Sequence, residues 1–173
     1  MGVVRVKESR EEIERLHSLI GQSMERAGTF LRTSFQIPEY SLSARQLVRY
    51  LECCRTVALA TVTAKGEPRV APIGSLFWRA RFYVPTVATA ARTRHVLVRP
   101  GISLAHYAEN DPAIIVHGHA VPVRLGHPHF DDLEDLHREI NGVSVRDWGD
   151  GLYLKIEADV LYTYARYPDR YPE

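Results

Sequence analysis

Two arginines and two threonines stand close together at the start of a segment with helical character, TAARTRHVLVRP. Arg92 and Arg94 are two residues apart, and Thr89 and Thr93 lie on either side of Arg92. Guanidinium groups match phosphate oxygens, and the amides and dipole of a helix N-terminus favour an anion. The spacing therefore predicts a phosphate site, although a solvated basic helix face explains the same residues equally well.

Four histidines form a second group that could do chemistry. His117 and His119 alternate across one residue and should share a strand face, and His127 and His129 follow soon after. Imidazoles can bind a transition metal or haem. No carboxylate or cysteine stands at a recognised ligand spacing, so solvated or hydrogen-bonded histidines are the preferred interpretation and no metal site is predicted.

The remaining polar and aromatic residues have simpler interpretations. Tyr107 and Trp148 are candidates for a lid over a bound cofactor, whereas other aromatic residues are expected in packing or dimer contacts. A group of acidic residues near position 130 reads as a solvated helix N-terminus rather than a catalytic carboxylate pair. This acidic group comprises Asp131, Asp132, Glu134 and Asp135.

The elements that would position these residues are predicted by hydrophobic periodicity and turn signals. One helix should run from Ser9 to near Gly28, followed by an extended connector over 30–42 and a second helix that Ser43 caps. Three strands are expected within 56–86, the third at roughly 80–85, and then a helix over 89–100. Two more strands (101–109 and 113–125), a helix (130–141) and a closing strand (152–168) complete a mainly β, antiparallel barrel with helices.

The order of these pieces resembles the FMN-binding split barrels related to pyridoxamine 5′-phosphate oxidase, which include deazaflavin-binding relatives. The matching segments are TVALATVTAKGEPRVAPI, RFYVPT, TAARTRHVLVRPGISL and VHGHA, and the resemblance covers roughly Ser43 to Tyr164. It implies an antiparallel split barrel over 43–173, preceded by an N-terminal helix and connector over 1–42. The segment YTYARYPDRYPE lacks the basic and histidine residues with which the vitamin-synthesising oxidase grips its substrate, so that activity is not expected.

The resemblance also implies a set of cofactor-binding residues. One strand would line the isoalloxazine ring, the next would flank the ribityl chain and the ring edge, and the start of the helix would hold the phosphate. Arg92 stands where the family commonly has lysine. The three groups are Arg69, Val70, Ala71, Pro72 and Ile73; Pro85 and Thr86; and Thr89, Ala91, Arg92, Thr93 and Arg94.

The implied function is that of an FMN-dependent oxidoreductase that transfers hydride to or from an unidentified small molecule. An F420 (deazaflavin)-dependent reductase is the closest alternative, because its phosphate-bearing tail would suit the same arginines. A non-catalytic flavin-binding or redox-sensing protein is an alternative of another class, with Cys53 and Cys54 as a readout. A homodimer is expected, since split-barrel relatives typically complete the cofactor slot from a second subunit.

Composition narrows the remaining partners. The 173 residues carry 22 Lys and Arg against 21 Asp and Glu, and this formal charge of +1 provides no field to attract nucleic acid or an anionic membrane. No apolar run approaches the roughly 20 residues of a membrane span, and no secretory signal is recognised at the start. Two neighbouring cysteines suit a reducing environment, so a cytoplasmic location is expected.

Overall fold

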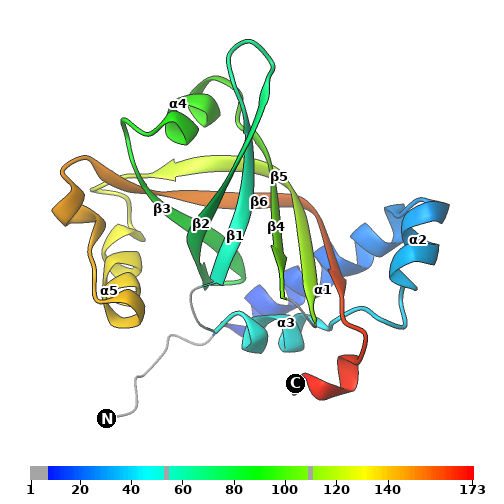
Figure 1. Ribbon diagram of the computed structural model, residues 1–173. Helices are drawn as coiled ribbons and strands as arrows, with labels where there is room; N and C mark the ends of the chain where they lie inside the picture. Colours follow the sequence, from blue (N-terminus) through cyan, green and yellow to red (C-terminus); the bar gives the residue numbers. More distant parts are fainter. Residues whose placement is uncertain (1–7, 53–54, 109–110) are drawn as a thin grey trace.

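The structure is a computed structural model that describes residues 8–52, 55–108 and 111–173. The cysteine pair at 53–54 lies outside the described residues. Six strands form the body of the molecule, and helices lie at its two ends and along one side (Figure 1). In chain order the elements are α1 (Arg10–Arg26), α2 (Thr29–Phe35), α3 (Ala44–Tyr50), β1 (Arg55–Val62), β2 (Pro68–Trp78), β3 (Arg81–Val87), α4 (Ala91–Val98), β4 (Gly101–Tyr107), β5 (Ala113–Val123), α5 (Phe130–Asn141), the short 3-10 helix η1 (Val145–Trp148), β6 (Gly151–Tyr164) and the 3-10 helix η2 (Pro168–Arg170).

Two helices begin where serine caps were predicted. The Ser9 hydroxyl accepts a hydrogen bond from the Glu12 amide, and the Glu12 carboxylate accepts one from the Ser9 amide at 2.8 Å. Ser43 and Gln46 make the same reciprocal pair at the start of α3. Such capping boxes satisfy amides that have no partner within the helix, so these two boundaries are encoded locally.

The predicted extended connector after the first helix is wrong over part of its length, because residues 29–35 form α2. The helix is held by Arg32, whose guanidinium donates hydrogen bonds to the carbonyl oxygens of Met24, Glu25 and Ala27 at the end of α1. No residue of α2 is buried. Its aromatic and β-branched residues have modest helix propensity, so a contact with α1, rather than local pattern, accounts for the helix.

The strands form a closed antiparallel barrel in the order β1-β2-β3-β6-β5-β4, which confirms the predicted mainly β split barrel. Strand β5 pairs with β6 over its whole length, with an irregularity after His117. Gly118 lies at this point, where a Cβ atom would stand 2.1 Å from the Glu157 carbonyl oxygen. A glycine therefore permits the close approach of the two backbones at this bulge.

Two apolar cores stabilise the barrel. The first lies inside it, where strand residues such as Leu59, Val84 and Leu154 meet Leu16 and Ile20 of α1. The second is formed by outward-facing strand residues and α5, and includes Tyr83, Phe130 and Tyr153. The N-terminal helix thus closes one end of the barrel, whereas α4 lies at the opposite end (Figure 1). In the described residues, no helix has the length and apolarity that crossing a membrane requires.

Candidate cofactor site

Strands β2 and β3 pair only next to their connecting turn and then separate. A cavity of about 420 Å³ lies beyond this point, between α4 and α5. This volume falls within the range of pockets that hold small molecules, about 300–1,000 Å³. Its lining is mainly apolar, with one cationic group. From the strands and α4 the cavity is lined by Ile73, Gly74, Pro85, Thr86, Val87 and Arg92.

Arg92 is held at the cavity by the buried Thr86, which in turn contacts the buried Thr93. The Nη1 atom of Arg92 donates to the Thr86 hydroxyl oxygen at 3.1 Å, and the Thr86 and Thr93 hydroxyl oxygens are 3.4 Å apart. Thr93 donates in turn to the Val87 carbonyl oxygen at 2.8 Å. No carboxylate in the described residues pairs with Arg92, so its remaining N–H groups can bind an anion.

The start of α4 adds donors beside Arg92. Its N-cap residue, Ala90, makes no side-chain capping bond, so the first-turn amides, including that of Ala91, have no side-chain acceptor. The amide of Thr89 instead donates to Asp150 at 3.0 Å, and Arg94 donates to the Thr89 carbonyl oxygen at 2.6 Å. Thr89 and Arg94 therefore stabilise the turn that leads into α4 rather than line the cavity.

Of the β2 residues that were expected to line a cofactor ring, only one lies at the cavity. Ile73 lines the cavity, but 69–72 lie farther along the strand toward its turn with β1. Arg69 pairs with Glu67 at 2.8 Å on the exposed part of that hairpin, and Val70 is 71% exposed. The structure thus brings together Ile73, Pro85, Thr86 and Arg92, and leaves 69–72 on an open surface beside them.

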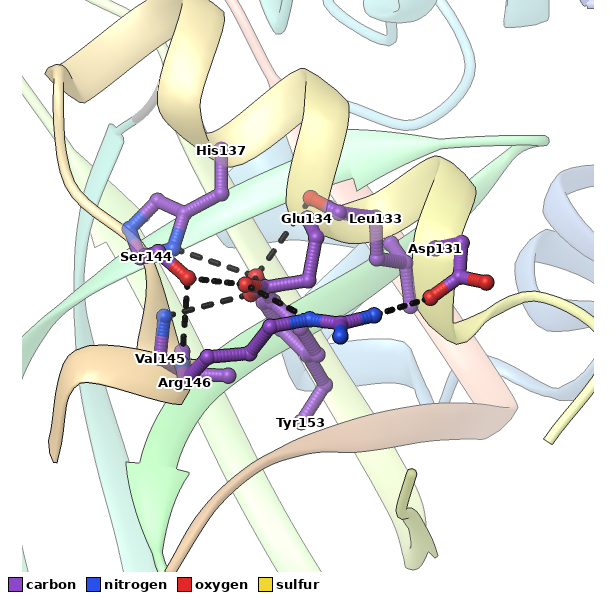
Figure 2. Close-up of polar contacts among 8 residues, drawn as sticks. All are labelled: Asp131, Leu133, Glu134, His137, Ser144, Val145, Arg146 and Tyr153. Carbon is purple, nitrogen blue, oxygen red and sulfur yellow. Dashed lines mark hydrogen bonds and ion pairs between the residues drawn. The ribbon is translucent and has the colours of Figure 1, made fainter. Parts of the chain in front are cut away.

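Sequence reasoning missed a buried hydrogen-bond network on the α5 side of the cavity (Figure 2). Glu134 was expected at a solvated helix N-terminus with three other acidic residues, and this is wrong because the residue is only 2% exposed. The carboxylate accepts hydrogen bonds from the Tyr153 hydroxyl at 2.5 Å, from the Val145 amide at 3.1 Å and from the Ser144 hydroxyl. The interval of three residues between Glu134 and His137 was the available signal, since it places both on one helix face.

These hydrogen bonds decide the charge of the carboxylate. Burial alone would raise the pKa of Glu134, but the hydrogen bonds from Ser144, Tyr153 and the Val145 amide together lower it below its ordinary value of 4.5. Burial and the neighbouring Glu134 raise the pKa of Tyr153, so the phenol keeps its proton. Arg146 extends from η1 to pair with Asp131, and its Nε atom lies 3.7 Å from Glu134.

His137 connects this network to the cavity, which it lines. Burial lowers the pKa of His137 below 6.5, against the opposing effect of Glu134, so the ring is neutral at pH 7. The Tyr153 hydroxyl has one proton, which it donates to the Glu134 carboxylate, the closer of the two acceptors. The Nδ1 atom of His137 lies 3.1 Å from the Tyr153 oxygen, so Nδ1 must be the donor of that hydrogen bond. The hydrogen-bond partners therefore assign the proton to Nδ1 and the lone pair to Nε2.

The Nε2 atom faces the cavity. It makes no hydrogen bond with a described residue, and among those residues Asp111 Oδ1 is the only fully buried side-chain polar atom without a partner. Since His137 itself is buried, the accessible part of its ring is the part that lines the cavity. The cavity thus has a guanidinium from α4 on one side and a hydrogen-bond acceptor from α5 on the other.

Trp148, one of the two lid candidates, lines the same cavity, and its ring centroid is 5.9 Å from that of His137. The η1 turn that carries it begins at Ser144, whose hydroxyl accepts from the Arg146 amide. A Cβ atom on Gly151 would stand 1.8 Å from the Val145 carbonyl oxygen, so glycine is required where η1 packs on β6. Tyr107, the other lid candidate, does not line the cavity.

The remaining histidines do not converge. His117 hydrogen-bonds with Ser103 at 2.8 Å, and His119 lies 3.9 Å from Asp159. His127 and His129 are neighbours, with ring centroids 5.4 Å apart. Within 8–52, 55–108 and 111–173, no group of three or more His, Cys, Asp or Glu side chains is arranged to hold a metal ion.

A sequence profile described as pyridoxamine 5′-phosphate oxidase matches residues 43–157, two thirds of the chain. The chain belongs to the pyridoxamine 5′-phosphate oxidase family. All the residues that line the cavity lie within the matched range, whereas α1 and α2 precede it. The family segment therefore contains the complete candidate site, and the N-terminal helices are an addition to it.

Solved structures place this family member among several split barrels. The conserved hypothetical protein Rv2991 from Mycobacterium tuberculosis has a TM-score of 0.66 at 13% identity, over 79% of this chain and 92% of its own. An F420 reductase has a TM-score of 0.54 at 16% identity, over 66% and 94%. HutZ, a heme storage protein from Vibrio cholerae, has a TM-score of 0.59 at 17% identity, over 69% and 93%. At these identities the likeness is one of fold, and no curated protein matches the chain.

Proposed function

We propose that the cavity binds FMN and that the chain is an oxidoreductase that transfers hydride to or from a small molecule. The observation that carries the proposal is Arg92, a guanidinium without a carboxylate partner, fixed by Thr86 at a mainly apolar cavity. An arginine in this position suits the phosphate of a bound cofactor, and membership of the family supports FMN as that cofactor.

The residues present fit such a group at both of its ends. Ile73, Pro85, Val143 and Trp148 offer apolar surface to a flat ring, and Arg92 with the first amides of α4 offers donors to a phosphate. FMN supplies the hydride chemistry when it is bound, so the protein has to bind, orient and shield it. Membership of the family thus agrees with the chemistry of the cavity.

In this proposal His137 acts on the ligand through Nε2. Tyr153 and Glu134 hold the proton on Nδ1, which leaves Nε2 as an acceptor for a hydrogen-bond donor of the ligand. The same atom can take up a proton, because Glu134 stabilises a positive charge on the imidazole. His137 is therefore the residue of this chain best placed to exchange a proton at the site.

A homodimer is part of the proposal. Apolar residues are exposed on the β1–β2 hairpin and on α4, namely Val70, Leu97 and Val98. The hairpin and α4 are in contact, since Arg99 donates to the Ala64 carbonyl oxygen (Figure 1). A second subunit on this surface would cover these residues and the cofactor ring. We expect sedimentation equilibrium to give about twice the mass of the chain, and a monomer at micromolar concentration would contradict the dimer.

The cofactor is tested by titrating the purified protein with FMN and recording its absorbance. We expect a tightly bound flavin with absorbance bands at about 370 and 450 nm. Binding of F420 instead, with a single band at about 420 nm, would assign the site to the deazaflavin. This cofactor also has a phosphate-bearing tail. The fold likeness to an F420 reductase makes this the first alternative to measure. Binding of neither cofactor would overturn the proposed site.

Turnover separates an enzyme from a flavin-binding or redox-sensing protein. The FMN-loaded protein is mixed with NADH or NADPH under air, and oxidation of the nicotinamide is followed by its absorbance at about 340 nm. Sustained consumption above the rate with free FMN supports hydride transfer at the site. Nicotinamide oxidation no faster than with free FMN, for both donors, would favour the non-catalytic alternative.

A further inference from the structure

A second candidate site lies at the end of the barrel that α1 closes, opposite α4 (Figure 1). Two cavities of about 240 and 260 Å³ adjoin there along the first half of the helix and its middle. They share Arg15 of α1 and Arg81 of β3 in their linings. None of their lining residues lines the candidate cofactor cavity, so the two regions are separate.

The cavity of about 260 Å³ is strongly cationic. Arg15, Arg79, Arg81 and Lys155 all line it. Two carboxylates oppose these four charges: Glu12 pairs with Arg79 at 2.6 Å, and Glu157 is shared by Arg81 at 2.8 Å and Lys155 at 2.7 Å. The cavity thus has a surplus of positive charge that a compact anion would neutralise.

Arg15 is the cation without a carboxylate partner. Its Nη2 atom donates to the Arg79 carbonyl oxygen at 2.8 Å, and no acidic group in the described part of the chain pairs with it. Arg15 is exposed, and desolvation together with the nearby Arg81 guanidinium lowers its pKa, whereas Glu12 and Glu157 oppose this shift. Its remaining N–H groups are free to bind an oxyanion.

Tyr83 supplies an independent indication of a ligand. The residue is 2% exposed and lines the cationic cavity, but its hydroxyl has no hydrogen-bond partner among the described residues. Because Asp111 Oδ1 is the only fully buried polar side-chain atom without a partner there, the Tyr83 hydroxyl is accessible from the cavity. Burial raises the pKa of Tyr83 to about 12, so the hydroxyl remains a donor at neutral pH. Buried tyrosines normally find a partner, and this hydroxyl is available to a molecule that enters the cavity.

The hairpin turn that presents these cations is held by α1. Arg79 and Ala80 have φ values of 51° and 57°, in the left-handed region that favours glycine or asparagine. Glu12 and Arg15 of α1 contact the side chain and the carbonyl oxygen of Arg79, respectively. Strained backbone of this kind persists where surrounding contacts maintain it, often at ligand sites. The position of Arg79 and Arg81 therefore depends on the docked helix.

The adjoining cavity combines apolar residues with the polar side chains of Ser18, Gln22 and Glu157. Leu16 and Leu19 of α1 face Phe77, Phe82, Ile156 and Leu161 of the barrel. Since Arg15 and Arg81 border both cavities, a ligand with its anionic group in one can extend its apolar part into the other. Such an arrangement selects an amphipathic molecule over a simple inorganic ion.

We propose that this end of the barrel binds a small organic oxyanion, a phosphate monoester or a carboxylate, among Arg15, Arg81, Lys155 and the Tyr83 hydroxyl. Its apolar part enters the cavity between α1 and the barrel. The proposal does not depend on the cofactor bound at the other end.

Calorimetric titration of the full chain with phenyl phosphate, benzoate and inorganic phosphate tests the proposal. We expect one of the two organic anions to bind at least about tenfold more tightly than inorganic phosphate, because only an organic anion buries apolar surface. Arg15→Ala should weaken that binding about tenfold, and Tyr83→Phe by a smaller factor, since each removes a donor to a charged group. Arg10→Ala, a matched change on the exposed face of the same helix, should have no effect.

Arg92→Ala distinguishes this site from the cofactor cavity. Unchanged binding of the organic anion in Arg92→Ala, with loss in Arg15→Ala, supports the second site. If the organic anion no longer bound to Arg92→Ala but still bound to Arg15→Ala, its binding would be assigned to the cofactor cavity and the proposal would be overturned. Equal affinity for inorganic phosphate, or no binding of either organic anion, would also overturn it.

Discussion

Replacing Arg92 by alanine is expected to weaken FMN binding about 10- to 100-fold, because hydrogen bonds to a charged group contribute about 1.5–3 kcal/mol. The substitution removes the guanidinium that Thr86 orients at the cavity and that no carboxylate neutralises. Quenching of FMN fluorescence on titration with protein gives the dissociation constant. The apolar contacts to the ring remain, so binding should be weakened rather than abolished.

Two variants make the Arg92 experiment specific. Arg45→Ala removes an arginine from the exposed side of α3, away from the cavity, and should leave the affinity unchanged. Arg92→Lys keeps the positive charge but loses the planar guanidinium group. Its dissociation constant for FMN should therefore lie between those of the wild type and Arg92→Ala. Equal dissociation constants for Arg45→Ala and Arg92→Ala would remove Arg92 from the site.

Replacing Glu134 by alanine is expected to lower the free energy of unfolding by about 3–5 kcal/mol, since it breaks a buried charge network. The hydroxyls of Ser144 and Tyr153 and the amide of Val145 would each lose a buried acceptor. Each donor left without a partner costs about 1–3 kcal/mol. Urea unfolding followed by circular dichroism measures the change.

Asp135→Ala is the matched control for Glu134. It removes the neighbouring carboxylate of the same helix, which is exposed, and should change the free energy of unfolding by less than about 0.5 kcal/mol. A similar small change in Glu134→Ala would contradict the network. Glu134→Ala should also disturb His137, so its ring resonances should shift in NMR spectra even where the fold is retained.

The Glu134 network also predicts a pH dependence of stability. The pKa of Glu134 is lower in the folded protein than its ordinary value of 4.5. Its contribution to stability is therefore complete above that ordinary value and is lost as the pH falls through the lower folded-state pKa. The difference in unfolding free energy between wild type and Glu134→Ala should accordingly shrink as the pH falls below about 4.

Much of the fold was predictable because its signals are local. Ser9 and Ser43 mark two helix starts through hydrogen bonds to residues three positions away. Alternating apolar residues predicted the strands, and β3 differs from its predicted range only by a shift toward Val87. The second helix was missed because Arg32 stabilises it through carbonyl groups of a different helix, a contact that periodicity does not report.

The candidate site was predictable only in part. Arg92 and Thr93 could be recognised beside each other at a helix start, and Pro85 and Thr86 followed from the family resemblance. The strand segment 69–72 was expected at the same site, but β2 separates from β3 there and carries these residues toward the β1–β2 hairpin. A strand motif specifies which residues alternate, whereas the course of the strand sets which of them reach a cavity.

The sequence alone determined the antiparallel barrel, the family and the guanidinium at the start of α4, because capping, alternation and a helix-start motif each act over a few residues. Only the tertiary structure decided that Glu134, Tyr153 and His137 form one buried chain that ends at the cavity. These residues come from a helix and a strand that pack through a shared core. Burial converts an apparently solvated carboxylate into an orienting group, and burial is a property of the packed barrel rather than of any segment.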